Sequence, residues 1–260
     1  MKALIGKSDL LFITLDTLRF DVAQAMFREE RLSCLGPRLG VEGWERRHSP
    51  ASFTYAAHHA FFSGFLPTPP HPGPHPRRFA AAFAGSESTA ESTFVFSEAT
   101  LPQALSARGY RSICVGGTGF FNRRNSLGEV LPSLFDEAHW DASLGVTCPE
   151  SPINQIQLAM ARVAEAREAR VFLFINASAL HQPNWYYGGV EGRDTLETHG
   201  AALCAFDAAL PPLFSLLEAR GPCEVIVCSD HGTAYGEDGH FGHRHAHPVV
   251  WTVPYAEFSL

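Results

Sequence analysis

A chain of 260 residues with 45% hydrophobic and 18% charged residues is long enough to bury a full core, and its composition is that of a globular protein. The formal net charge of −7 lacks the basic excess of nucleic-acid-binding proteins, so no nucleic-acid partner is expected. If the substrate is an anion, a local positive charge such as a metal ion must attract it, because the protein as a whole repels it.

The cysteines and the N-terminal segment predict where the protein resides. The six cysteines are scattered and form no Cys-x-x-Cys pair, which favours a reducing cytoplasm over a disulfide framework. The apolar run that ends before Asp16 is too short for a membrane span and has no signal-peptide cleavage pattern. We therefore expect a cytoplasmic protein without a membrane partner, and the sequence does not indicate its oligomeric state.

Four apolar, β-branched or aromatic runs predict strands, in chain order Leu10–Leu15, Arg111–Val115, Val171–Ile175 and Glu224–Cys228. Helical patterns lie between them, at Leu101–Arg108, Ile153–Arg167 and Leu196–Leu217. Nearly continuous apolar strands are typical of parallel sheets covered on both faces. The order predicts an α/β fold with a doubly wound, mostly parallel sheet and helices on both faces.

Two other segments predict loops rather than regular structure. Residues 66–78 are mostly Pro, Gly, His and Arg, and residues 84–93 are small and polar. No internal repeat or domain linker is evident, so we expect one domain over residues 1–260.

Acidic and imidazole side chains follow three of the predicted strands. Asp16 comes directly after the first strand, the segment NASALHQPN follows Ile175, and SDHGTAYGEDGHFGHRHAH follows Cys228. Ligands of open α/β sheets bind beyond the carboxyl ends of the strands. The sequence therefore predicts a functional site at this edge.

The strongest local signal is the tetrapeptide Ser229-Asp230-His231-Gly232. Asp and neutral His are ligands for divalent ions, and Gly allows the backbone to turn tightly behind them. Taken alone, the tetrapeptide is more typical of an Asx-type turn with a solvated His231. The residues around it favour a metal site instead.

These residues resemble the alkaline phosphatase/sulfatase superfamily, whose sulfatases carry SDHG, a GExG turn, a Gly-Lys pair and a later Val-Pro. The chain has SDHG at 229–232, GEDG at 236–239 and Val-Pro at 253–254. Gly242-His243 stands at the Gly-Lys position, so His243 replaces the lysine that contacts the sulfate in sulfatases.

An upstream match places the nucleophile. The segment Ser63–Pro67 is similar to the family's Thr-Gly-x-x-Pro, and counting back puts Thr54 where sulfatases have the Cys or Ser that becomes formylglycine. Thr cannot become formylglycine, and phosphate- and phosphonate-cleaving relatives use an unmodified Thr there. The resemblance implies a small sulfatase-like hydrolase that prefers phosphoryl-type esters. The alternative for Thr54 is a plain N-cap of the helix that comes after it.

Two further matches imply roles for single residues. The segment LDTLRFD at 15–21 is similar to the family's opening motif, whose first Asp, here Asp16, ligates metal. The segment 172–183 is similar to the one that supplies a substrate-facing histidine, here His181. The resemblance covers nearly the whole chain, least well at 66–150. Because the chain stops soon after residue 254, we expect it to lack the C-terminal subdomain of many sulfatases.

The resemblance implies metal ligands, catalytic residues and auxiliary residues. The expected metal ligands are Asp16, Thr54, Asp230 and His231. The expected catalytic residues are Thr54, His181 and His243, the two histidines binding the transferred group or protonating the leaving oxygen. Residues considered for a second metal or for the substrate are His58, His247 and Arg19.

An oxygen-rich site with one imidazole suits Zn²⁺, Mn²⁺ or Mg²⁺. Two-metal relatives add an Asp-x-x-x-His pair, but here the corresponding residues are Ala177 and His181. One ion is therefore favoured, and a second ion bound by other histidines stays an alternative.

The expected function is metal-dependent hydrolysis of a small anionic ester, either a phosphate mono- or diester, a phosphonate or a sulfate. Metal coordination and a helix N-terminus would activate the Thr54 hydroxyl. A transferase that passes the group from Thr54 to an alcohol, and a non-catalytic metal-binding partner protein, stay open as alternatives. Specificity is expected from the loop 66–78 and from residues 184–187.

Overall fold

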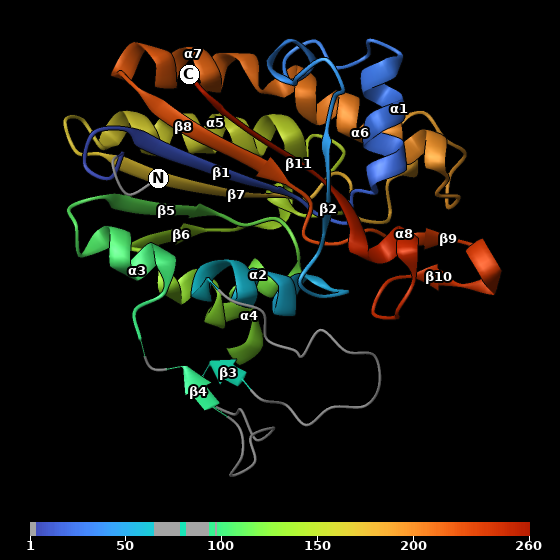
Figure 1. Cartoon of the computed structure of the whole chain (residues 1–260), viewed down its shortest axis with the longest axis horizontal. Helices are drawn as coiled ribbons and strands as arrows, with labels where there is room; N and C mark the ends of the chain where they lie inside the picture. Colours follow the sequence, from blue (N-terminus) through green and yellow to red (C-terminus); the bar gives the residue numbers. More distant parts are fainter. Residues whose placement is uncertain (1–3, 65–78, 82–93, 97) are drawn as a thin grey trace.

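The computed structural model of the chain describes residues 4–64, 79–81, 94–96 and 98–260. The loops predicted at 66–78 and 84–93 lie outside the described residues. A seven-stranded sheet forms the centre, in the order β2-β11-β8-β1-β7-β5-β6 (Figure 1). Its strands are β1 (Asp9–Leu15), β2 (Glu45–His48), β5 (Arg111–Val115), β6 (Glu137–His139), β7 (Val171–Ala177), β8 (Cys223–Cys228) and β11 (Thr252–Ser259).

Within this sheet, β8, β1, β7, β5 and β6 are parallel, and β11 runs antiparallel to both β8 and β2. Two small ribbons accompany it. β9 (Ala234–Tyr235) pairs with β10 (Phe241–Gly242) antiparallel, and β3 (Phe79–Ala81) pairs with β4 (Phe94–Phe96) parallel.

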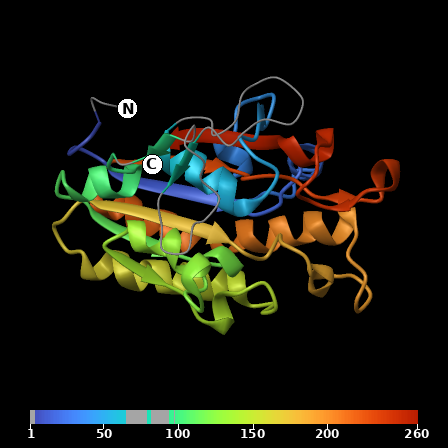
Figure 2. The same ribbon diagram turned by 90° about the horizontal axis from the view of Figure 1, so that it is seen from below.

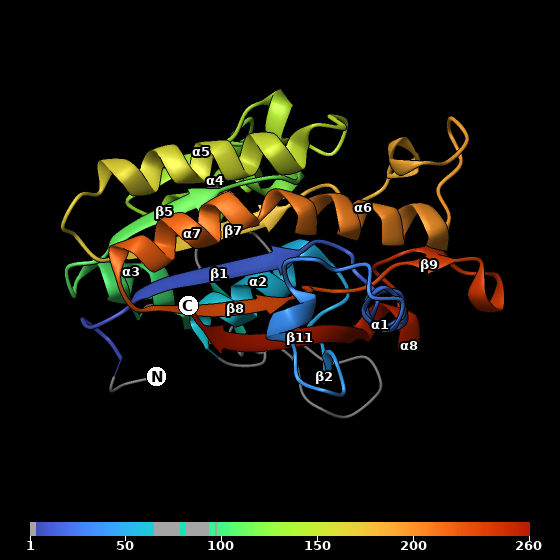
Figure 3. The ribbon, with the colours of Figure 1, turned by 90° about the horizontal axis from the view of Figure 1, so that it is seen from above.

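The helices are α1 (Phe20–Arg28), α2 (Thr54–Ser63), α3 (Leu101–Ser106), α4 (Ser126–Val130), α5 (Ser151–Glu165), α6 (Leu196–Ala209), α7 (Pro211–Arg220) and α8 (Pro248–Trp251). Short 3₁₀ turns occur at Gly36–Arg38, Gly119–Phe121, Pro132–Leu134, Ala142–Leu144, Trp185–Tyr187 and Glu237–Gly239. Helices α1, α5, α6 and α7 cover one face of the sheet, and α2, α3 and α4 lie on the other (Figure 1). Figures 2 and 3 view the molecule from these two sides.

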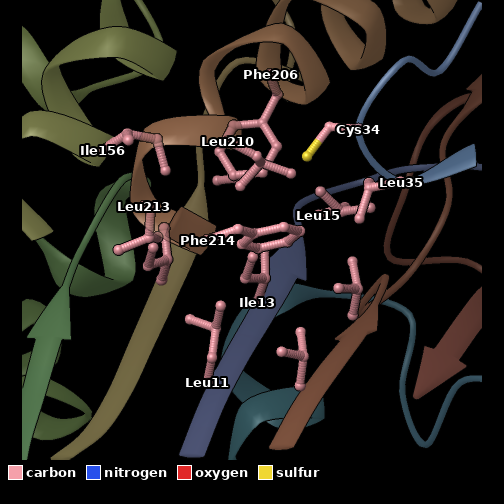
Figure 4. Packing of buried hydrophobic residues seen from close by; sticks show 14 of the residues in the cluster. Leu11, Ile13, Leu15, Cys34, Leu35, Ile156, Phe206, Leu210, Leu213 and Phe214 are labelled. Atoms are coloured by element: carbon pink, nitrogen blue, oxygen red, sulfur yellow. The ribbon is translucent and has the colours of Figure 1, made fainter. Parts of the chain in front are cut away.

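The alternation of side chains along β1 explains the two layers. Leu11, Ile13 and Leu15 point to one face, where they pack with apolar residues of α6 and α7 such as Phe206 and Phe214 (Figure 4). Phe12 points to the other face and belongs to a second buried cluster, which includes residues of α2 and α3. Both faces are buried, which is why the strand reads as one continuous apolar run. The predicted doubly wound α/β fold is confirmed.

The four predicted strands are present, and the structure corrects the helical segment predicted at Leu196–Leu217. It is two helices, because Pro211 lacks a backbone N–H and begins α7 at its first residue. The span Leu196–Arg220 is apolar and long enough to cross a membrane by composition, and 50% of its most apolar window is buried inside the protein. Core helices pass the same test, and both helices pack on the sheet.

Candidate metal centre

Parallel pairing of β1 with β8 brings the two aspartates together. Thr14 pairs with Cys228, so Asp16 and Asp230 each lie two residues beyond a paired position at the same edge of the sheet. Asp16, Asp230 and His231 each offer one ligand atom, and these atoms lie within 4.8 Å of one another. All three side chains are fully buried. The structure thus assembles three of the four predicted metal ligands.

Two carboxylate oxygens in this cluster have no hydrogen-bond partner among the described residues, Asp16 Oδ1 and Asp230 Oδ2. They lie 4.0 and 3.5 Å from His231 Nε2, respectively. The opposite oxygens are held in place. Asn176 Nδ2 donates to Asp16 Oδ2 at 3.0 Å, and the backbone N–H groups of Thr17 and His231 donate to Asp230 Oδ1. Buried carboxylate oxygens without a donor are unfavourable unless a cation satisfies them.

The imidazole of His231 is oriented as a ligand. Its Nδ1 lies 2.9 Å from the carbonyl oxygen of Gly232, so Nδ1 carries the proton and Nε2 keeps its lone pair. Burial lowers the pKa of His231, which keeps the ring neutral near pH 7. Two buried carboxylates and a neutral imidazole form a donor set that fits a divalent cation.

The two aspartates affect each other's pKa because they are buried side by side. Burial and the negative charge of Asp16 raise the pKa of Asp230 well above its ordinary value. Burial also acts to raise the pKa of Asp16, but His181, His231 and the Asn176 amide outweigh it, so the pKa of Asp16 is lowered. A bound cation would relieve the repulsion between the two carboxylates.

Thr54 begins helix α2 and points at the cluster. Its Oγ1 lies 3.4 Å from Asp16 Oδ2 and 3.3 Å from His231 Nε2, and the side chain is buried. The cap position of α2 belongs to Phe53, so the alternative that Thr54 serves as a plain N-cap is wrong. The hydroxyl therefore sits at a helix N-terminus beside the metal donor set.

Glycine at position 232 is required by the approach of a neighbouring segment. A Cβ there would lie 2.0 Å from the carbonyl oxygen of Val249, which is in α8. Ser49 Oγ also donates to the carbonyl oxygen of Asp230. The turn after β8 is thus clamped between α8 and the segment that precedes α2.

His58 lies one helical turn after Thr54 and is fully buried rather than on the surface. Its Nδ1 is 2.7 Å from the carbonyl oxygen of Thr54, and its Nε2 is 2.9 Å from Thr14 Oγ1. Burial lowers its pKa to about 4. Because both ring nitrogens have protein partners, the structure places His58 as a support for Thr54. It does not present His58 as a ligand for a second ion.

His181 and His243 lie beside His231. The ring centroid of His243 is 4.5 Å from that of His231 and 5.6 Å from that of His181. His243 follows β10, where Gly242 has a φ of 73° that reverses the loop. Burial, followed by the neighbouring His231 and His181, lowers the pKa of His243 to about 3. The structure brings both predicted histidines to the edge of the centre.

The side chains of Arg19 and His247 are paired with carboxylates outside the metal centre. The guanidinium of Arg19 is bound by Asp21 at 2.5 Å and by Glu237, so its positive charge is already balanced. His247 Nε2 lies 3.1 Å from Asp238 Oδ2, next to the rings of His240 and His245. No contact in the described part of the chain joins His247 to Asp16 or Asp230.

Sequence reasoning missed Asn176, a buried polar residue that positions Asp16. It pairs across the sheet with Thr14, and its Nδ2 holds Asp16. Its Oδ1 accepts from the backbone N–H and hydroxyl of Thr118. The signal available was a lone Asn within the apolar run of β7, at the edge where the other site residues were predicted.

Comparison with proteins of known structure shows that the chain has a known fold. No family model and no curated protein matches the sequence. The periplasmic domain of the phosphoethanolamine transferase EptC from Escherichia coli, solved in complex with Zn, matches with a TM-score of 0.63 and 12% identity, over 97% of this chain and 73% of that one. The integral membrane phosphoethanolamine transferase EptA from Neisseria meningitidis matches with a TM-score of 0.63 and 16% identity, over 98% of this chain and 48% of that one.

A third solved structure is a protein of the alkaline phosphatase superfamily from Vibrio parahaemolyticus, with a TM-score of 0.56 and 17% identity, over 96% of this chain and 60% of that one. The chain thus spans about half the length of the membrane transferase and three fifths of this protein. It has the fold of the alkaline phosphatase superfamily, and the resemblance read from the sequence is confirmed at the level of the fold. Two of these neighbours are periplasmic or membrane proteins, so they do not support the predicted cytoplasmic location.

Proposed function

We propose that the chain is a metal-dependent enzyme that cleaves phosphoryl-type esters with Thr54 as the nucleophile. The observation that carries this proposal is the position of Thr54 Oγ1 at the N-terminus of α2, 3.4 and 3.3 Å from Asp16 and His231, two members of the buried donor set. Zn²⁺ in one structural neighbour supports a divalent metal. Asp16, Asp230, His231 and Thr54 would hold the ion.

Thr54 and the start of α2 have defined tasks in this reaction. A bound divalent ion would lower the pKa of the Thr54 hydroxyl and polarise the phosphoryl group. Thr54 loses its proton to solvent, Oγ1 forms a bond to phosphorus, and the bond from phosphorus to the leaving oxygen breaks. Water then attacks phosphorus and loses a proton to solvent, the bond from phosphorus to Oγ1 breaks, and Oγ1 takes a proton back from solvent. The helix N-terminus of α2 stabilises negative charge on Oγ1 throughout.

His243 and His181, which lie beside His231, have different roles in the proposed reaction. The lowered pKa of His243 makes it a neutral hydrogen-bond donor to the phosphoryl oxygens rather than a proton donor. His181 Nδ1 is bound to the carbonyl oxygen of Gln182, and its Nε2 has no hydrogen-bond partner among the described residues. His181 Nε2 can therefore take up a proton from solvent and pass it to the leaving oxygen, which makes His181 the better candidate for this role.

A transferase would use the same first step and differ only in the acceptor, an alcohol instead of water. The names of two structural neighbours, both phosphoethanolamine transferases, favour keeping this second function. Adding ethanolamine or glycerol to the assay separates the two. A transferase releases nitrophenol faster with the alcohol while free phosphate does not increase, whereas a hydrolase releases both together.

The ester preference tests the proposed reaction directly. With Zn²⁺ or Mn²⁺ supplied, we expect nitrophenyl phosphate and phosphonate esters to be cleaved at least about tenfold faster than nitrophenyl sulfate, a difference of roughly 1.4 kcal/mol in activation free energy. The physical reason is that an unmodified Thr cannot follow the formylglycine route. Nitrophenol release across the panel is the measurement. Faster cleavage of the sulfate would contradict the proposal.

His243 gives a second test with a matched control in the same loop. His243→Ala is expected to lower kcat/KM at least about tenfold, because its ring lies 4.5 Å from that of His231 and would contact the transferred group. His245→Ala is expected to change kcat/KM much less, since the ring of His245 contacts those of His240 and His247 instead. Equal losses in the two variants, or a larger loss for His245→Ala, would show that the loop is placed wrongly.

A further inference from the structure

A phosphoryl substrate needs more positive charge at the centre than the metal ion leaves. This inference rests on the proposed function. A divalent ion would neutralise the carboxylates of Asp16 and Asp230, so the ion and its two carboxylates together carry no net positive charge. Arg19 is already paired with Asp21 and Glu237. A phosphomonoester is a dianion at about pH 8, so its second negative charge needs another cation at the site.

Arg244 is an exposed cation beside the centre that forms no ion pair within 4.0 Å in the described part of the chain. Its guanidinium carbon lies over two aromatic rings, 5.6 Å from the centroid of Phe53 and 6.0 Å from that of Phe120. This stacking holds the side chain by its apolar face. Among the described residues the N–H groups at the rim of the guanidinium form no hydrogen bond, so they can donate to an anion.

The backbone fixes Arg244 next to the nucleophile. Its N–H donates to the carbonyl oxygen of Ser52 at 2.9 Å, two residues before Thr54. Phe53, under the guanidinium, is the cap residue of α2. Arg244 also follows His243 directly, and its φ of 75° is a conformation that non-glycine residues rarely adopt. The loop is thus attached at this point to the segment that presents Thr54.

The influence of Arg244 on neighbouring groups agrees with this placement. Burial is the main cause of the lowered pKa of His231 and of His243, and the positive charge of Arg244 contributes to both. The guanidinium is therefore close enough to act electrostatically on the metal donor set and on the histidine next to it.

We propose that Arg244, stacked on Phe53 and Phe120, binds the anionic oxygens of the phosphoryl group and makes the site selective for dianionic phosphomonoesters over monoanionic diesters. A guanidinium can donate two parallel hydrogen bonds to two phosphoryl oxygens. In a diester one of those oxygens carries a substituent and the group has one charge less. Arg244 thus supplies positive charge to the substrate, a contact for which Arg19 was one of the residues considered from the sequence.

Binding of inorganic phosphate to the metal-loaded protein tests the proposal without requiring turnover. Calorimetry at pH 8 should show at least about tenfold weaker phosphate binding for Arg244→Gln, equivalent to roughly 1.4 kcal/mol, and an intermediate loss for Arg244→Lys. Arg124→Gln is the matched control, because Arg124 is also exposed and stacks on an aromatic ring, Trp140, at 4.5 Å. It should bind phosphate like the wild type. Metal content should be unchanged in all variants.

Steady-state kinetics with a phosphomonoester and a phosphodiester measure the selectivity between the two ester classes. Arg244→Gln should raise KM for a phosphomonoester at least about tenfold, and should change KM for a diester by no more than about threefold. Unchanged phosphate binding in Arg244→Gln, equal losses in Arg244→Gln and Arg124→Gln, or a wild type that does not bind phosphate would overturn the proposal. Phosphate binding that depends on Arg244 in a protein that cleaves no ester would instead refute the proposed function and leave this inference standing.

Discussion

Replacing Thr54 with alanine is expected to lower kcat for phosphoryl esters at least about a thousandfold, a loss of roughly 4 kcal/mol in transition-state stabilisation. The covalent route cannot proceed without the hydroxyl, which is placed 3.4 Å from Asp16 Oδ2 and 3.3 Å from His231 Nε2. Steady-state turnover of a nitrophenyl phosphate measures the effect. Full activity of the variant would rule out Thr54 as the nucleophile.

The fold should tolerate this change, which makes the loss of activity interpretable. The cap position of α2 is Phe53, and His58 is bound to the backbone carbonyl oxygen of Thr54 rather than to its hydroxyl. Thermal unfolding of Thr54→Ala should therefore stay close to that of the wild type, and Asp16, Asp230 and His231 should retain most of the metal. Thr54→Ser, which keeps the hydroxyl, should retain measurable turnover. Equal inactivity of the Ser and Ala variants would indicate a positional rather than a chemical role.

The parts of the fold predicted from sequence are those where burial is visible in the residues themselves. β1 and β7 are buried on both faces and read as apolar runs. β2 was not predicted because its four residues, Glu45–His48, are exposed and charged, so the strand depends on pairing with β11. Pro211 was a local signal for the break between α6 and α7. One helix was predicted instead, because the apolar pattern continues across Pro211.

The candidate site shows the same division between local and tertiary information. The positions of Asp16 and Asp230 just after apolar runs predicted a site at this edge, and the family resemblance implied that they are ligands. The parallel register of β1 and β8 then brings them together. The roles of Asn176 and Arg244 could not be read in this way. Asn176 acts through its cross-strand neighbours, and the role proposed for Arg244 depends on a loop attached to Ser52, nearly two hundred residues earlier in the chain.

Replacing Asp230 should separate metal binding from stability, because the residue is favourable for one and unfavourable for the other. Asp230→Ala and Asp230→Asn should each lose most of the bound metal, about one divalent ion per chain in the wild type, as measured by elemental analysis. Asp238→Ala is the matched control, since Asp238 is an exposed aspartate on the same loop that binds His247. The control should keep the wild-type metal content, and unchanged metal in Asp230→Ala would refute the site.

Without metal, replacing Asp230 should stabilise the folded protein. Asp230 is fully buried beside Asp16, and its raised pKa means that its ionised form is disfavoured in the folded state. A group of this kind destabilises the fold above its unfolded-state pKa, so at neutral pH its negative charge acts against folding. Asp230→Asn removes that charge and can still accept the hydrogen bonds from the backbone of Thr17 and His231.

After chelation, Asp230→Asn should therefore melt at a higher temperature than the wild type, by about 2–4 °C for each kcal/mol of repulsion removed. With metal present the order should reverse, because only the wild type gains the binding free energy. Paired thermal melts with and without chelator make the comparison. If the metal-free variant melted below the metal-free wild type, the repulsion between Asp16 and Asp230 would not be the cost that a bound cation offsets, and the two carboxylates would have to be holding the fold together by some other contact.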